Sequence, residues 1–167
     1  MSIFPTKILL ATDSSEEATL AARTAVDLAD KTSSELHVVL VGLSAAYVGV
    51  GPPEIADIPG PRQEELNEEA RRILSAQLRQ IEAEGGTVAQ AHFRTGKPDQ
   101  EIVKLGKEIG VGLIVMGSRG LGGIRRALVG SVSDSVLRHA HCPVLVVRKE
   151  KPAEEAEQTG PEEVGLV

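Results

Sequence analysis

The chain has 167 residues and a net charge of −6, and this length suits one domain whose core needs no disulfide or metal. Aromatic residues make up only 2% of it, which argues against a surface that stacks nucleic-acid bases. A single cysteine, Cys142, excludes a disulfide within the chain and fits a reducing compartment. No apolar run approaches the roughly 18 residues of a membrane span, so we expect a cytoplasmic protein that binds neither membrane nor nucleic acid.

The N-terminal third of the chain alternates strand and helix patterns. Residues 6–11 form an apolar run of strand length, and Ser14 with Glu17 three residues later predicts a capping box at a helix start. The buried stripe of this helix is expected to consist of small residues at helical spacing, namely Ala18, Ala21, Ala22, Ala25 and Ala29. Residues 35–43 predict a second strand, and the Gly- and Pro-rich residues 44–61 predict either a mobile connection or a lid.

The middle of the chain continues this alternation. Residues 62–84 predict a long amphipathic helix. Residues 87–95 predict a third strand, which is less apolar than the others and therefore suits an edge of the sheet. Pro98 suits the first turn of the next helix. The all-apolar residues 111–116 predict a fourth strand that is buried on both faces.

The last helix and strand complete the pattern. Ser131 and Asp134 predict a helix start, and the buried face of that helix is expected to be Val132, Val136, Leu137 and Ala140. Residues 143–148 predict the fifth strand. Residues 1–148 are therefore expected to form one domain, and the acidic, aperiodic residues 149–167 a disordered tail. Five alternations of strand and helix predict a parallel, doubly wound α/β sheet.

A glycine motif stands between the fourth strand and the last helix. Gly117 and Gly120 follow the strand, and Gly130 with Ser131 follows nine residues later. Glycine lets backbone N–H groups approach an anion with no Cβ in the way. A helix start adds unpaired N–H donors and the positive end of the helix dipole. The spacing therefore predicts a phosphate-binding site.

This motif, G-x2-G-x9-G-[ST], and the surrounding residues 117–148 closely resemble the ATP-binding branch of the universal stress protein family. The resemblance implies a Rossmann-like three-layer sandwich with a five-stranded parallel sheet of order 3-2-1-4-5. In that order the connections reverse direction between strands 1 and 4, and ligands bind at such a switch point. The strand ends at Thr12-Asp13 and Met116-Gly117 would flank it. A departure stands at Ser14, where the family often has glycine.

The resemblance also implies the ligand and its contacts. The expected ligand is ATP, AMP or ADP, with Mg²⁺ carried on the phosphates. Asp13 would accept a hydrogen bond from adenine or ribose, and Arg119 would contact ribose or phosphate. Val41, or alternatively Val39, would pack against the adenine. The expected nucleotide-binding residues are Ala11, Thr12, Asp13, Val41, Met116, Gly117, Arg119, Gly120, Gly130, Ser131, Val132 and Ser133.

A homodimer through the last strand is implied as well, with Val144, Leu145, Val146 and Val147 at the interface, and an open apolar edge strand physically favours such pairing. The leading function is a nucleotide-dependent stress or signalling module. Two alternatives stay open. One is a slow ATPase or an enzyme that phosphorylates itself at Ser131, Ser133 or Ser118, and the other is a dimeric interaction module that binds no nucleotide. The sequence predicts no catalytic residue and no metal ligand.

Overall fold

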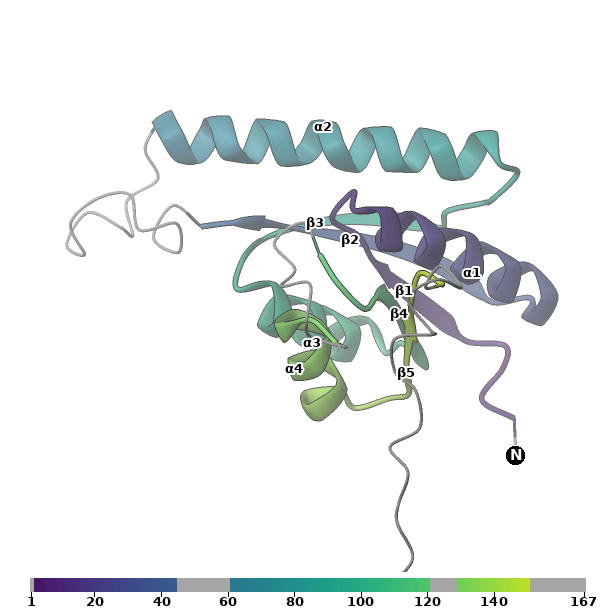
Figure 1. The fold of residues 1–167 in the computed structure, drawn as a ribbon. Helices are drawn as coiled ribbons and strands as arrows, with labels where there is room; N and C mark the ends of the chain where they lie inside the picture. The colour runs from purple at the N-terminus through teal and green to yellow at the C-terminus, as the bar shows by residue number, and fades with distance from the viewer. Residues whose placement is uncertain (1, 45–60, 121–128, 151–167) are drawn as a thin grey trace, which may run out of the picture.

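Five parallel strands lie between two layers of helices in the computed structural model, which describes residues 2–44, 61–120 and 129–150 (Figure 1). The elements in chain order are β1 (Lys7–Ala11), α1 (Glu16–Thr32), β2 (Glu35–Leu43), α2 (Pro61–Ala83), β3 (Gln90–Gly96), α3 (Pro98–Ile109), β4 (Leu113–Gly117), α4 (Ser131–His139) and β5 (Val144–Val147). Each predicted strand and helix is present. Residues 44–61, predicted as a mobile connection or a lid, and the predicted disordered tail lie almost wholly outside the described residues.

The strand order is β3-β2-β1-β4-β5, which confirms the expected 3-2-1-4-5 topology. In the central strand β1, Leu10 lies opposite Val38 of β2 and Val115 of β4. These three side chains are fully buried, as expected for inner strands with helices on both faces. The less apolar β3 lies at one edge, as predicted, and β5 lies at the other.

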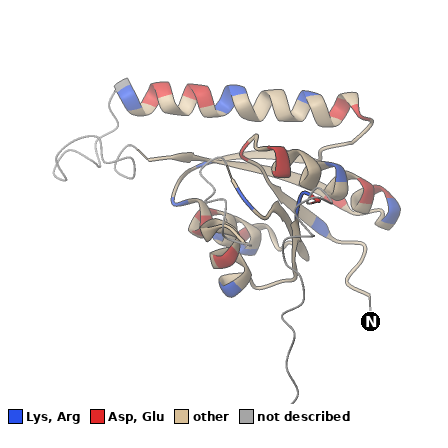
Figure 2. Cartoon of the chain, viewed as in Figure 1, with Lys and Arg blue, Asp and Glu red and all other residues tan. Residues whose placement is uncertain are grey.

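Alternate residues of each strand face opposite layers of the core. Ile8 and Leu10 of β1 pack in the cluster that includes Ala21 of α1, whereas Leu9 packs in the cluster that includes Leu105 of α3. Figure 1 shows α1 and α2 on one face of the sheet, and α3 and α4 on the other. Charged residues of both signs are interspersed along the helices, while the strands carry few (Figure 2).

The five predicted alanines of α1 are all buried, which confirms the stripe that lets this helix lie close to the sheet. The start of α1 differs from the prediction. The N-cap is Ser15, whose hydroxyl accepts from Ala18 N at 3.2 Å. Ser14 stands one residue outside the cap with a φ of 65°, in the left-handed region that favours glycine. The capping box between Ser14 and Glu17 is therefore wrong.

The start of α4 also needs a correction. Its N-cap is Gly130, with extended backbone and no side-chain capping bond, so Ser131 is the first helical residue rather than the cap. Val136 is buried as predicted, but Leu137 is 45% exposed. Successive residues of a helix are about 100° apart, and Val136 lies at the centre of the buried stripe. Leu137 therefore lies at the outer border of that stripe.

Candidate functional site

A cavity of about 820 Å³ opens at the carboxyl ends of the strands. It lies where β1 and β4 stand side by side while the chain connections leave them in opposite directions, the switch point predicted above. All twelve residues predicted to bind nucleotide line this cavity, namely Ala11, Thr12, Asp13, Val41, Met116, Gly117, Arg119, Gly120, Gly130, Ser131, Val132 and Ser133. Val39, the alternative to Val41 for packing against adenine, lines the cavity as well.

Apolar side chains from the flanking helices complete the wall. Leu66 and Ile73 of α2 and Ile102 of α3 line the cavity. The sequence places all three on the buried stripes of their helices, and nothing in the local pattern tells which part of a stripe ends at a cavity. These residues were therefore missed as site residues.

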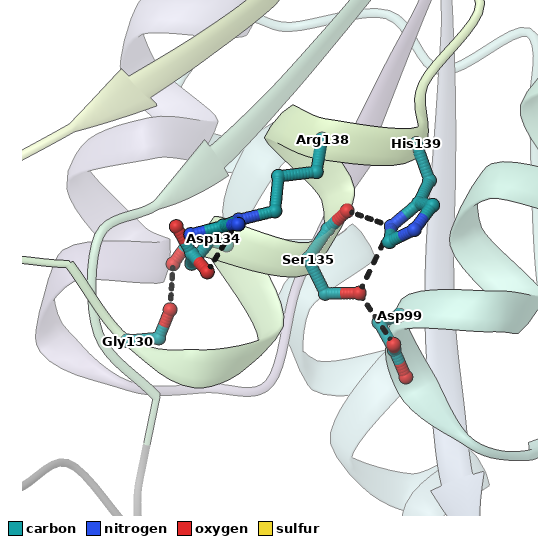
Figure 3. A network of polar contacts seen from close by, with 7 residues as sticks. Asp99, Gly130, Asp134, Ser135, Arg138 and His139 are labelled. Atoms are coloured by element: carbon teal, nitrogen blue, oxygen red, sulfur yellow. Dashed lines mark hydrogen bonds and ion pairs between the residues drawn. The ribbon is translucent and has the colours of Figure 1, made fainter.

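Backbone donors that no described residue pairs gather at the start of α4. The first bond within this helix runs from Asp134 N to the Gly130 carbonyl, at 2.9 Å (Figure 3). The N–H groups of Ser131, Val132 and Ser133 make no hydrogen bond to any described residue. Three N–H groups without a partner among the described residues, at the positive end of a helix dipole, form a site suited to an anion.

Other donors predicted to meet phosphate are already engaged within the protein. The Gly130 N–H donates to the Ser118 carbonyl at 2.6 Å, and the Ser133 hydroxyl donates to the same oxygen at 2.8 Å. Ser133 can therefore offer its backbone N–H to a ligand without breaking a bond, but not its hydroxyl proton. Ser131 is exposed, and its hydroxyl makes no bond to the described chain.

The three motif glycines serve two different purposes. A Cβ on Gly117 would lie 3.0 Å from the Glu17 carbonyl carbon, and one on Gly130 would lie 3.0 Å from the Ser118 carbonyl oxygen. These two glycines allow parts of the protein to pack closely. A Cβ on Gly120 would instead lie 2.5 Å from Asp13 Oδ2, and both residues line the cavity.

The β1 end contributes polar groups with defined partners. Asp13 Oδ1 accepts from Ser15 N at 2.9 Å, which orients its carboxylate beside the cavity. The Thr12 N–H donates to the Val39 carbonyl at 3.0 Å. The Thr12 hydroxyl lies 3.5 Å from Gln77 Oε1 of α2. Thr12 thus joins the end of β1 to β2 and α2. The side chain of Asp13, unlike that of Thr12, faces Gly120.

The Arg119 side chain holds a buried donor. Its Nε is buried and has no hydrogen-bond partner among the residues that the structure describes, and the residue lines the cavity. Buried donors are almost always paired in folded proteins. Because the Nε has almost no exposed surface, it does not itself face the cavity, and a ligand there would meet other atoms of Arg119.

A serine, a histidine and an aspartate meet between α3 and α4, but not as a catalytic triad (Figure 3). The Ser135 hydroxyl donates to Asp99 Oδ2 at 2.6 Å. His139 Nδ1 lies 2.8 Å from the Ser135 carbonyl, and a carbonyl can only accept, so this nitrogen carries the proton. It cannot then take a proton from the serine. The network instead joins α4 to the first turn of α3.

Within the described residues, no group of three His, Cys, Asp or Glu side chains could hold a metal ion. His141 Nε2 lies 3.0 Å from the Val111 carbonyl, and burial raises the pKa of the Cys142 thiol. Among the helices that the structure describes, none is both long and apolar enough to cross a membrane.

Comparisons with known proteins agree with this architecture. The model of the universal stress protein family matches residues 5–148. Universal stress protein YxiE of Bacillus subtilis (strain 168) is 34% identical over 145 residues, which cover 85% of this chain and 98% of the relative. Universal stress protein MJ0531 of Methanocaldococcus jannaschii is 33% identical over 145 residues, with 87% and 83% covered.

Solved structures show the same likeness. The structure of hypothetical protein MJ0577 superimposes with a TM-score of 0.74 at 29% identity, covering 90% of this chain and all of that one. UspA from Lactobacillus plantarum gives a TM-score of 0.71 at 28% identity, covering 88% of this chain and all of that one. A family match over residues 5–148, together with the strand order and the glycine motif, shows that this protein belongs to the universal stress protein family.

Proposed function

We propose that this protein binds an adenine nucleotide in the cavity at the carboxyl ends of β1 and β4, and acts as a nucleotide-dependent stress or signalling module. The observation that carries the proposal is a set of backbone donors at one cavity that have no partner among the described residues. The backbone N–H groups of Ser131, Val132 and Ser133 have no acceptor in the described chain, and Arg119 lines the same cavity. A phosphate group supplies acceptor oxygens and the negative charge that a helix start favours.

The rest of the cavity suits a nucleoside. Val41 and Met116 supply apolar surface for adenine, and the flexible Met116 side chain adapts to a flat ring. The Asp13 carboxylate can accept from a ribose hydroxyl or from an adenine N–H. Mg²⁺ would be carried on the phosphates, whose oxygens are ligands of the kind that this cation prefers.

Two further structures share this fold with bound ligands in their descriptions. One universal stress protein was solved in complex with cAMP, and one from Archaeoglobus fulgidus in complex with dAMP. Both are 23% identical to this chain, so the likeness extends to the fold alone. The proposal for this protein therefore depends on its own cavity and donors.

A proline at position 131 tests the role of the N–H groups directly. Proline is favoured at the first position of a helix, and it favours an extended preceding residue. Gly130 already has a φ of −69° and a ψ of 162°, so Ser131→Pro should fold normally while it removes one donor. Ser131→Ala, which keeps the N–H and removes the hydroxyl, is the matched control.

The measurement is calorimetric titration with MgATP. A hydrogen bond to a charged group contributes about 1.5–3 kcal/mol, so Ser131→Pro should weaken binding by about 10–100-fold. Ser131→Ala should bind within a fewfold of wild type. Equal binding by the proline variant, or no binding by wild type at millimolar MgATP, would overturn the proposal. Mass analysis of small molecules released on denaturation gives an independent check, since an adenine nucleotide is the expected finding.

Self-phosphorylation has less support from the geometry than binding. Ser118 is 1% exposed and its hydroxyl is bonded to Glu17 of α1. Ser133 is 2% exposed and its hydroxyl donates to the Ser118 carbonyl. Of the three serines predicted as acceptors of phosphate, only Ser131 is exposed. A phosphopeptide at Ser131 after incubation with labelled ATP would favour the enzymatic alternative.

A homodimer through β5 is part of the proposed function. β5 pairs with β4 on one side only, and Val144, Leu145, Val146 and Val147 are each partly buried. An apolar edge strand of this kind favours pairing with a second copy. Sedimentation should give the mass of a dimer at micromolar concentration, and a monomer mass throughout that range would contradict this interface.

A further inference from the structure

Ser118 lies at a junction between three segments that are far apart in the sequence. Its N–H donates to the Val147 carbonyl at the end of β5, at 2.8 Å. Its carbonyl accepts from Gly130 N and from the Ser133 hydroxyl at the start of α4. Its hydroxyl donates to Glu17 of α1. With 1% of its surface exposed, Ser118 has every polar group paired inside the protein.

Glu17 secures this junction from the opposite side. One carboxylate oxygen, Oε2, accepts both from the Ser118 hydroxyl and from Arg119 N, the latter at 2.7 Å. Glu17 therefore ties two successive residues after β4 to the first turn of α1. The close approach of Gly117 to the Glu17 backbone, described above, permits these bonds.

The junction holds the donors of the proposed phosphate site on both sides. Arg119 and Gly120 follow directly after Ser118 in the chain, and α4 begins where Gly130 bonds to the Ser118 carbonyl. Glu17 is not among the residues that line the cavity, whereas Arg119, Gly120 and Ser131 are. Apart from the effect of its charge, Glu17 therefore acts on a ligand through the residues that it holds.

We propose that Glu17 is a positioning residue of the nucleotide site, which holds the Ser118–Arg119 turn so that the donors around it converge on phosphate. This proposal rests on the proposed function. A carboxylate charge near a polyphosphate opposes binding, so the useful property of Glu17 is its geometry as an acceptor. Glutamine has the same shape, and its carbonyl oxygen can accept both bonds without the charge.

Three variants separate these roles. Glu17→Ala removes the acceptor, and Glu17→Gln keeps the acceptor and removes the charge. Glu16→Ala is the matched control, because Glu16 is the neighbouring residue of α1 and its carboxylate pairs at the surface with Lys149. Each variant is titrated with MgATP and with adenosine, which has no phosphate.

Glu17→Ala should weaken MgATP binding about tenfold or more while adenosine binding stays within about twofold, because loss of aligned donors affects phosphate only. Glu17→Gln should bind MgATP as well as wild type or better, and Glu16→Ala should match wild type. The proposal is overturned if Glu17→Ala binds MgATP like wild type, or if Glu17→Gln loses as much as Glu17→Ala. Equal losses for MgATP and adenosine would overturn it too, since they indicate general damage.

Amide hydrogen exchange without ligand distinguishes this proposal from the proposed function. In Glu17→Ala the amides of Arg119 and Gly130 should exchange at least about tenfold faster, while those of β1 stay protected. Unchanged exchange at both amides overturns the positioning role, even if wild type binds MgATP. If these amides exchange faster in Glu17→Ala but wild type binds neither MgATP nor adenosine, Glu17 holds the turn as described and the proposed nucleotide site is rejected. Should Glu17→Ala not fold, Ser118→Ala removes the hydroxyl bond alone and is judged by the same two measurements.

Discussion

Replacing Gly117 by alanine would place a methyl group against the backbone of α1. The new Cβ would lie 3.0 Å from the carbonyl carbon and from the Cβ of Glu17, and 3.1 Å from Ala18 N. These atoms belong to a helix turn that Ser15 caps, so they cannot move as a flexible side chain would. The turn must shift by a few tenths of an ångström, and overpacking of this kind costs about 1–3 kcal/mol.

We therefore expect Gly117→Ala to lower the free energy of unfolding by about 2 kcal/mol. For a chain of this size that corresponds to a fall in melting temperature of about 4–8 °C. Urea unfolding and scanning calorimetry at one protein concentration measure both quantities. The same shift would stretch the bonds from Ser118 and Arg119 to Glu17, so MgATP binding should weaken as well.

Gly106→Ala is the matched control for this prediction. Gly106 is buried within α3, and an added Cβ would lie 3.3 Å from Val111 Cγ2 and 3.5 Å from Ile114 Cδ1. Both are side-chain methyl groups, and alanine is favoured over glycine in a helix by about 1 kcal/mol. This variant should therefore be as stable as wild type or slightly more stable. If Gly117→Ala proves as stable as wild type, or if both variants lose equally, the reasoning from backbone contact is refuted.

Three further outcomes are expected. Ser14→Gly should raise the free energy of unfolding by about 0.5 kcal/mol in urea titrations. Glycine relieves the strain of the left-handed backbone at this position, and this gain exceeds the cost of the entropy that glycine adds to the unfolded chain. A loss of stability would contradict this reasoning. Burial, with His37 and Arg94 nearby, lowers the pKa of His92 below its ordinary 6.5, so the unfolded chain binds a proton that the folded chain does not, and stability should be lost as the pH falls below 6.5. The replacement His92→Gln should make that loss less steep in melting curves between pH 7 and 5, and an unchanged slope would count against the assignment. Ser135→Ala should lower stability by about 1 kcal/mol in urea titrations, because it removes the hydrogen bond from α4 to α3, and an unchanged midpoint would show that this bond contributes nothing.

The local pattern of the chain determined the elements and pointed to the place of the candidate site. Alternating apolar runs and helical stripes predicted every strand and helix, because burial against a sheet demands those periods. The five alanines of α1 and the all-apolar β4 were identified correctly for this reason. The strand order came from the family resemblance, and the glycine spacing led to the residues that surround the cavity.

Only the tertiary structure decided how the site is held together. The sequence predicts a capping role for Glu17. In the structure, it accepts hydrogen bonds from residues about one hundred positions away in the chain. The sequence predicts that Gly117 and Gly130 make room for an anion. In the structure, each lies against another part of the protein backbone instead. The choice between a local and a distant partner depends on which groups the fold brings within hydrogen-bond distance. Sequence periodicity reports which face of an element is buried, but it carries no information about which atoms meet there.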